Sequence, residues 1–339
     1  MKTKIFKIFF IATFILLVFS VFSFAETERI WNLTLGSRMP EVSLESQAIL
    51  KFIELAEEKS QGKIVIIPYF GDILGSSTVQ PENVSTGVQD MYVDSYSMCM
   101  HFIKDFRVHS IPYFFKDNEE YRKFLLSPIE KEMEQKFIDQ YNIRVINENK
   151  NWLRGPYRVI IARNPILSID DLKGLKLRQG DVPATIKTWS ALGANTIVIP
   201  YNEAYLALKQ GMVDAVTVPL ENVYSGKFYE GAKHVTITHE YQQQLAIMMN
   251  EDTYQALPDE LKHALIDAVN EAGDICTKSI NESGAKRKDQ LEKDHGVTFY
   301  EIDLEPWAKL SAEVHVALEE EGFLPKGLMK RIKDYLESD

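Results

Sequence analysis

The sequence predicts an α/β protein of two doubly wound lobes, with a cleft between them and a long C-terminal helix that crosses both. Two observations lead to this prediction. Short apolar strands alternate with helical patterns in two separate series, and the polar stretch 147–156 interrupts the periodicity between them. A helical stripe then begins at Pro258 and continues to Asp294. Such a helix is roughly 50 Å long at 1.5 Å per residue, longer than one lobe is wide.

The first series begins with a strand, a helix and a second strand. Residues 29–37 alternate like a strand, and a helix from Ser43 has apolar residues at the i, i+3, i+4, i+7 spacing. Residues 63–70 form an apolar, β-branched strand, which is typical of a parallel sheet covered on both faces. Further along, we expect a helix at 78–88, a strand at 91–96, a helical region at 118–141 and a strand at 143–146.

The second series has the same pattern. Helices at 183–192 and 202–210 each stop at a glycine, and a strand starts almost directly afterwards. The strands are expected at 157–162, 174–178, 195–199 and 213–218. We assign residues 26–153 and 244–282 to lobe I, and residues 154–243 and 283–339 to lobe II.

The first 25 residues have the pattern of a cleaved secretory signal peptide: lysines, an apolar run and a small-residue exit at Ser23-Phe24-Ala25. The alternative is an uncleaved membrane anchor, because the apolar run is nearly long enough to span a bilayer. The segment contains three of the 38 basic residues and none of the 49 acidic ones, so the mature chain has a formal charge of −14. Such an acidic chain makes a nucleic-acid partner improbable.

The chain contains two cysteines, Cys99 and Cys276. They could pair in an oxidising compartment, but both fall on apolar patterns, which favours two buried free thiols. Common enzymatic signatures are absent: the sequence contains no Walker loop, G-x-G-x-x-G, G-x-S-x-G or H-E-x-x-H. We therefore expect no enzyme, no cofactor and no metal.

Three arginines stand near predicted strand ends: Arg38, Arg158 and Arg178. A guanidinium offers a planar fork that matches a carboxylate with two parallel hydrogen bonds. For Arg178, in "GLKLRQGD", an anion contact and a structural ion pair are equally compatible with the sequence. Arg38 and Arg158, taken singly, are more typical of salt bridges.

Residues 168–219 resemble the signature region of the solute-binding proteins of TRAP transporters, in the DctP-like group. The family pattern D-L-K-G-x-K-[IL]-R is met by Asp171 to Arg178, L-G-A by Leu192 to Ala194, and E-x-Y-x-A-L-x-x-G-x-V-D by Glu203 to Asp214. The resemblance covers nearly all of the mature chain. It implies a periplasmic binding protein that captures a small organic acid between its lobes and delivers it to small and large membrane subunits, driven by an ion gradient.

The resemblance also implies a set of ligand-binding residues. Arg178 would be the main carboxylate anchor, Arg158 a second contact and Tyr201 a stacking aromatic, although Tyr201 could also be an ordinary core residue. The remaining positions implied by the family pattern are Arg38, Asp94, Ser95, Gln244 and Val218.

One departure from the family concerns Val218, where an asparagine is common. Because the valine side chain cannot hydrogen-bond, we expect a ligand with an apolar part near Val218 and a second anionic group near Arg38. A sensory binding protein that signals to a membrane receptor would need the same cleft, so the sequence does not separate this role from transport. The oligomeric state stays open between a monomer, which we favour, and a dimer formed through the long helix.

Overall fold

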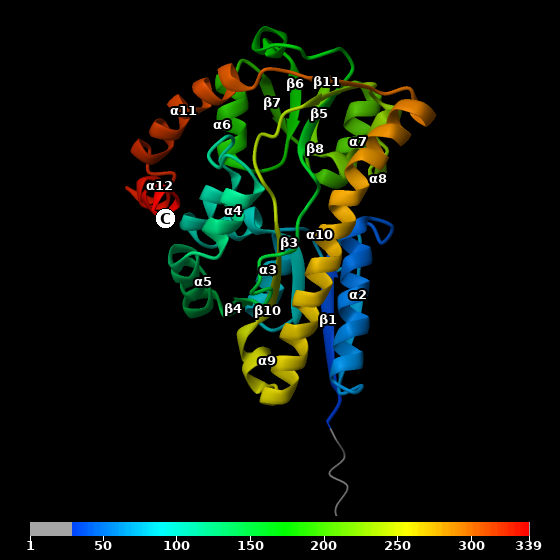
Figure 1. The fold of residues 1–339 in the computed structure, drawn as a ribbon, viewed down its shortest axis with the longest axis vertical. Helices are drawn as coiled ribbons and strands as arrows, with labels where there is room; N and C mark the ends of the chain where they lie inside the picture. The colour runs from blue at the N-terminus through cyan, green and yellow to red at the C-terminus, as the bar shows by residue number, and fades with distance from the viewer. Residues whose placement is uncertain (1–28, 339) are drawn as a thin grey trace, which may run out of the picture.

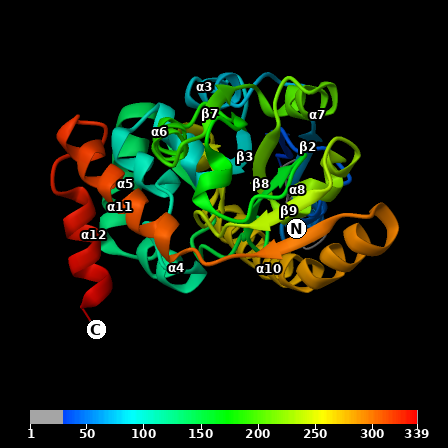
Figure 2. The same cartoon turned by 90° about the horizontal axis from the view of Figure 1, so that it is seen from above.

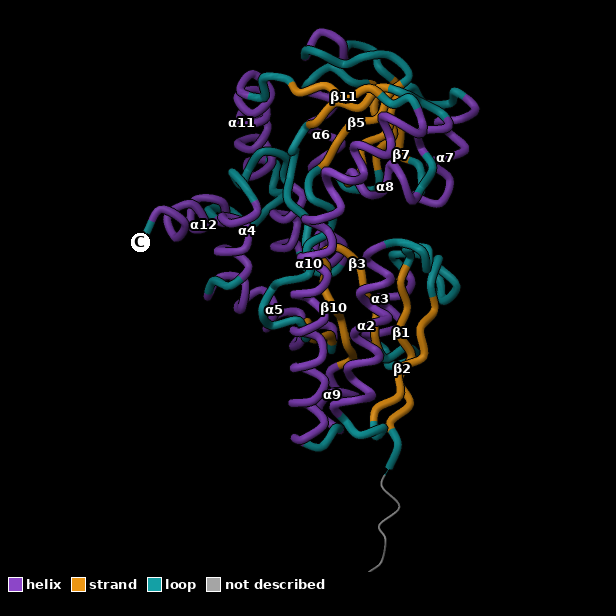
Figure 3. Tube along the Cα trace, turned by 45° about the vertical axis from the view of Figure 1, so that its right-hand side comes forward, coloured by secondary structure: helices purple, strands orange, loops and turns teal. Residues whose placement is uncertain are grey.

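The chain forms two α/β lobes, one around each of two sheets (Figure 1). The computed structural model describes residues 29–338, so the predicted signal peptide lies outside the described residues. The first lobe has a five-stranded sheet in the order β2-β1-β3-β10-β4, and the second a six-stranded sheet in the order β11-β9-β5-β8-β6-β7. Figure 3 shows the two sheets in separate blocks of the molecule. The predicted two-lobe α/β architecture is confirmed.

The strands of the first sheet are β1 (Trp31–Ser37), β2 (Ile64–Tyr69), β3 (Met91–Ser95), β4 (Ile143–Val145) and β10 (Leu245–Asn250). The strands of the second are β5 (Arg158–Ala162), β6 (Lys176–Gln179), β7 (Asn195–Val198), β8 (Ala215–Pro219), β9 (His234–Ile237) and β11 (Thr298–Glu301). The helices up to residue 191 are α2 (Leu44–Lys59), α3 (Val79–Ser85), α4 (Asn118–Leu125), α5 (Pro128–Tyr141) and α6 (Pro183–Ala191). The later helices are α7 (Tyr201–Gln210), α8 (Leu220–Ser225), α9 (Glu251–Ala256), α10 (Asp259–His295), α11 (Glu305–Glu320) and α12 (Leu328–Glu337). Across residues 29–338, no helix combines the length and the apolar character that a bilayer crossing requires.

Apolar clusters cover both faces of each sheet, which explains the nearly continuous apolar strands. Along β10, Ala246 and Met248 belong to one buried cluster, whereas Ile247 and Met249 belong to another. Along β5, Val159 and Ile160 are divided between two clusters in the same way. Successive side chains of a strand point to opposite faces, so a strand covered on both sides has no polar alternation.

Each sheet also contains a strand that runs against its neighbours. In the first sheet, β10 is antiparallel to β3 and β4, and in the second, β5 is antiparallel to β8 and β9. Both strands begin directly after the chain has crossed from the other lobe. They therefore enter their sheets from the end that faces the cleft, and this places residues 154–158 and 241–244 between the lobes.

The helix α10 runs continuously over 37 residues and contacts α2 in the first lobe and α8 in the second. This confirms the predicted crossing helix. The α-helix continues through Gly273 and Gly284. A Cβ at Gly273 would overlap with Asn151 Oδ1, and one at Gly284 would lie 3.2 Å from Pro156. The glycines thus let the crossing segment pack closely against the helix.

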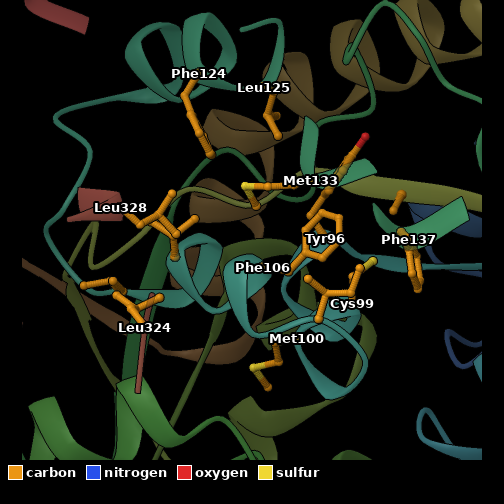
Figure 4. Close-up of a cluster of buried hydrophobic side chains, with 14 of the residues drawn as sticks. Tyr96, Cys99, Met100, Phe106, Phe124, Leu125, Met133, Phe137, Leu324 and Leu328 are labelled. Carbon is orange, nitrogen blue, oxygen red and sulfur yellow. The ribbon is translucent and has the colours of Figure 1, made fainter. Parts of the chain in front are cut away.

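The last two helices connect the lobes along one flank (Figure 2). Helix α11 packs against α6 of the second lobe, whereas α12 packs against α4 of the first. Figure 4 shows Leu324 and Leu328 with Phe124 and Leu125 in one buried cluster. The division from the sequence placed all of residues 283–339 in lobe II, and the structure differs from it here. The sequence of a short amphipathic helix shows which face of the helix is apolar, but not which lobe that face packs against.

The two cysteines are free and buried, and they lie in different clusters, Cys99 in one and Cys276 in another. Burial raises the pKa of both thiols. We expect a reductant to leave the melting temperature of the purified protein unchanged, because it has no disulfide to break. A thermal melt with and without dithiothreitol checks this, and a lower melting temperature in reductant would contradict it.

Candidate functional site

A cavity of about 420 Å³ lies between the lobes and is lined by residues from both. The first lobe contributes Arg38 and the loop from Asp72 to Thr78, and the second contributes the ends of β6 and β8 and the start of α7. The two crossing segments complete the wall. Ligands of doubly wound sheets bind beyond the carboxyl ends of the strands, so this cavity is where the fold predicts a site.

Arg178 lies near the end of β6, just before the chain turns at Gly180, and is 6% exposed. Its Nε donates to the carbonyl oxygen of Ile199 at 2.8 Å. Among residues 29–338, no carboxylate is within ion-pair distance of its guanidinium. Burial, with the neighbouring cations Arg38 and Arg158, lowers the pKa of Arg178 to about 10. Of the two roles compatible with the sequence, a structural ion pair is thus not observed, and the cavity contains a buried cation without a counter-ion.

Arg158, the first residue of β5, also lines the cavity, but each of its three guanidinium nitrogens already donates a hydrogen bond within the protein. Nε donates to Glu240 Oε1 at 2.5 Å, Nη1 to Gln243 Oε1 at 2.8 Å and Nη2 to Thr217 Oγ1 at 3.2 Å. Glu240 is completely buried. Burial raises the pKa of Glu240, and the guanidinium beside it acts in the opposite direction. Arg158 is therefore a neutralised, rigid part of the wall.

Arg38 and Arg154 share one carboxylate. Arg38 Nη2 lies 3.3 Å from Asp94 Oδ1, and Arg154 Nη1 lies 3.2 Å from the same oxygen. Arg154 also pairs with Glu45 through Nε at 3.2 Å. The sequence pattern did not single out Arg154, because it lies in the polar stretch 147–156, which indicates only a crossing between lobes. Its place in the segment between the two lobes was the one feature of the sequence that could have indicated a position in the cavity wall.

Tyr201 begins α7 and lines the cavity while its ring packs edge to face against Phe228. Its hydroxyl accepts a hydrogen bond from Asn222 Nδ2 at 3.0 Å. Tyr201 is thus both a wall residue and part of a buried cluster. Val218 lines the cavity from β8 and is 2% exposed. Asn222, four residues later, brings an amide to this wall that the sequence did not reveal.

The other three expected residues lie behind the wall. Asp94 acts as the counter-ion described above and accepts from Tyr92 Oη at 2.8 Å. Ser95 accepts from Gln243 Nε2 at 3.3 Å. Gln244 pairs with Leu153 in an isolated bridge, and Gln243 lines the cavity instead. In extended backbone, neighbouring side chains point to opposite sides, which is why Tyr241 and Gln243 line the cavity and Gln244 between Gln243 and β10 does not.

The comparisons with known proteins agree with this geometry. Residues 35–321 match the model of the bacterial extracellular solute-binding proteins of family 7, named DctP. The C4-dicarboxylate-binding periplasmic protein DctP of Rhodobacter capsulatus is 28% identical over 78% of this chain and 79% of its own. The sialic acid-binding periplasmic protein SiaP of Vibrio cholerae is 26% identical over 81% of this chain and 84% of its own.

Solved structures show the same fold. A TRAP periplasmic solute-binding protein from Roseobacter denitrificans, with bound L-galactonate, has a TM-score of 0.81 at 24% identity and covers 91% of this chain and 99% of its own. One from Ochrobactrum anthropi has a TM-score of 0.78 at 26% identity, with 91% and 96% covered. The family model spans most of the chain, and the cavity lies where the two lobes meet. The chain therefore belongs to family 7 of the bacterial extracellular solute-binding proteins, the DctP family of TRAP transporters.

Proposed function

We propose that this protein captures a small organic acid in the cavity between its lobes and delivers it to the small and large membrane subunits of a TRAP transporter. One observation carries the proposal: Arg178 lines the cavity as a buried guanidinium with no carboxylate partner among the described residues. A buried charge without a partner is costly, and an incoming carboxylate would supply the missing counter-ion. Relatives named for acid ligands, such as sialic acid and C4-dicarboxylates, support the same class of ligand.

The neighbouring groups have distinct roles in this proposal. Arg178 donates two charge-assisted hydrogen bonds to the ligand carboxylate as the lobes close and exclude water. Arg158, neutralised by Glu240, orients the wall beside it, and Tyr201 offers an aromatic face. Binding selects the closed form because both lobes contact the ligand only in that form. The closed shape is what the membrane subunits recognise, on the periplasmic side to which the signal peptide directs the chain.

A thermal-shift screen of the mature protein tests this proposal. The panel contains C4-dicarboxylates, 2-oxo acids, aromatic acids, sugar acids and amino acids. An acid present at a hundred times its dissociation constant should stabilise the fold by about 2.7 kcal/mol. The acid should be recovered unchanged after incubation, as expected of a binding protein rather than an enzyme. A panel in which no acid raises the melting temperature would contradict the proposal.

A further inference from the structure

We propose that Asp94 and Asp72 restrict this site to acids that carry a single negative charge. This inference rests on the proposed function and narrows its ligand class. It replaces the expectation, made from the sequence, that Arg38 receives a second anionic group. The reason is the state of Arg38, which has two carboxylates beside it.

Backbone hydrogen bonds hold Asp72 close to Arg38. The Asp72 nitrogen donates to the Ser37 carbonyl oxygen at 3.3 Å, and the Gly71 nitrogen donates to the Met39 carbonyl oxygen at 3.1 Å. These bonds place the turn at Asp72 against the two residues that flank Arg38 in the chain. Asp72 has a φ of 63°, a left-handed conformation that aspartate and asparagine adopt more readily than most residues.

The charges of Arg38, Asp94 and Asp72 reinforce this arrangement. Asp94 Oδ1 is 3.3 Å from Arg38 Nη2, and Arg38 and Asp72 both line the cavity. Although burial alone would lower the pKa of Arg38, its pKa is raised overall, mainly by Asp94 and to a smaller extent by Tyr92, Tyr201 and Asp72. The side chain of Asp72 has one long hydrogen bond, from Gln80 Nε2 at 3.4 Å. Arg38 therefore has one carboxylate, that of Asp94, within ion-pair distance and a second, that of Asp72, nearby, so most of its charge is already balanced.

The remaining cations of the cavity are in a similar state, with one exception. Four arginines and His101 are the basic residues among the cavity-lining residues of the described chain. Arg154 pairs with Glu45 and Asp94, and Arg158 pairs with Glu240. Burial lowers the pKa of His101, which favours its neutral form. Only Arg178 then offers a positive charge that no protein carboxylate balances.

A second negative charge on the ligand would consequently find acidic neighbours. The half-buried carboxylate of Asp72 lies in the cavity wall, and the exposed side chains of Asp181 and Glu203 also line it. A like charge brought next to these carboxylates is unfavourable, most of all at Asp72, which is the least exposed of the three. A neutral polar end has partners instead, because Ser76, Ser77 and Thr78 bring hydroxyl groups to the same wall.

Two pairs of acids that differ by one charge test this inference by thermal shift and calorimetry. Succinamate and succinate are nearly isosteric, and D-gluconate and D-glucarate share one carbon skeleton. For each pair that binds, we expect the wild type to bind the singly charged acid at least about tenfold more tightly. We expect Asp72→Asn to reduce that ratio by on the order of tenfold, because it removes one repulsive charge beside Arg38. Asparagine keeps the left-handed turn, so this variant should fold.

Asp94→Asn should reduce the ratio further, and Asp72→Asn decides the question if Asp94→Asn fails to fold. Asp170→Asn is the matched control, because it removes the same charge from an exposed residue that pairs with Lys173 outside the cavity. The control should keep the wild-type ratio. A wild type that binds diacids as tightly as their singly charged partners overturns the inference but leaves the proposed function intact. The same holds if Asp72→Asn and Asp170→Asn give equal ratios. If neither these acids nor the screening panel bind, the proposed function fails and this inference with it.

Discussion

Replacing Arg178 by glutamine should abolish acid binding and leave the ligand-free protein at least as stable as the wild type. The loss of affinity should be at least about thirtyfold, since truncating one partner of a buried charge pair costs about 2 to 5 kcal/mol. The expected effect on stability comes from the ligand-free protein, in which the charge of Arg178 is buried without a counter-ion among the described residues. In the ligand-free protein, burial lowers the pKa of Arg178, which means that the fold disfavours its charged form. Removing the charge relieves that cost.

Two controls make the result specific. Arg178→Lys keeps the charge but loses the planar fork, so binding should weaken by less than in the glutamine variant. Arg122→Gln removes an arginine that also donates to a backbone carbonyl, that of Asn149, but lies outside the cavity, and it should bind acids normally. Calorimetry and thermal melts of the four proteins give both quantities. If Arg178→Gln binds acids as well as the wild type, the anchor assignment is wrong.

The fold was largely predictable because its signals are local. Apolar strands such as 63–70 and helices that stop at Gly193 and Gly211 are visible without any long-range information. The predicted boundaries of helices were wrong where a local capping feature interrupts the apolar periodicity. The helical region 118–141 is two helices, because Ser127 caps the second one through the backbone nitrogen of Glu130, and Pro128 follows at its first position. Strands β9 and β11 pair with each other, and sequences of only four residues gave no strand signal when taken alone.

The site was predictable where a motif fixes the position. Arg178 follows from the K-[IL]-R element, and the structure places it in the cavity wall. The charge state of the site was not predictable, because it depends on partners far away in sequence. Glu240 lies 82 residues from Arg158, and Asp94 lies 60 residues from Arg154. For this reason the sequence suggested a second anion near Arg38 without showing that Asp94 pairs with this arginine.

The buried pair of Arg158 and Glu240 gives the largest expected effect on stability. Arg158→Gln should reduce the free energy of unfolding by about 3 to 5 kcal/mol, because it leaves a fully buried carboxylate without its counter-ion. Glu240→Gln should be similarly damaging, since it leaves Arg158 unneutralised beside Arg178. The double variant should recover most of the loss, because two neutral amides of similar size need no charge compensation. Chemical denaturation of the wild type and the three variants gives the coupling free energy.

The loss in Arg158→Gln should also depend on pH, with a defined sign. Burial already raises the pKa of Glu240 above its ordinary value of 4.5, and Arg158 is the main group that lowers it. Without Arg158 the folded-state pKa rises further, so the folded protein holds a proton that the unfolded chain releases. Stability is then retained below about pH 4.5 and lost as the pH rises through the folded-state pKa. The difference in unfolding free energy between Arg158→Gln and the wild type should therefore be larger at pH 8 than at pH 5.

The double variant, which has no carboxylate at position 240, should not show this dependence on pH. A loss that is equal at both pH values would mean that hydrogen bonding of Arg158 to Gln243 and Thr217, rather than its charge, stabilises this wall of the cavity.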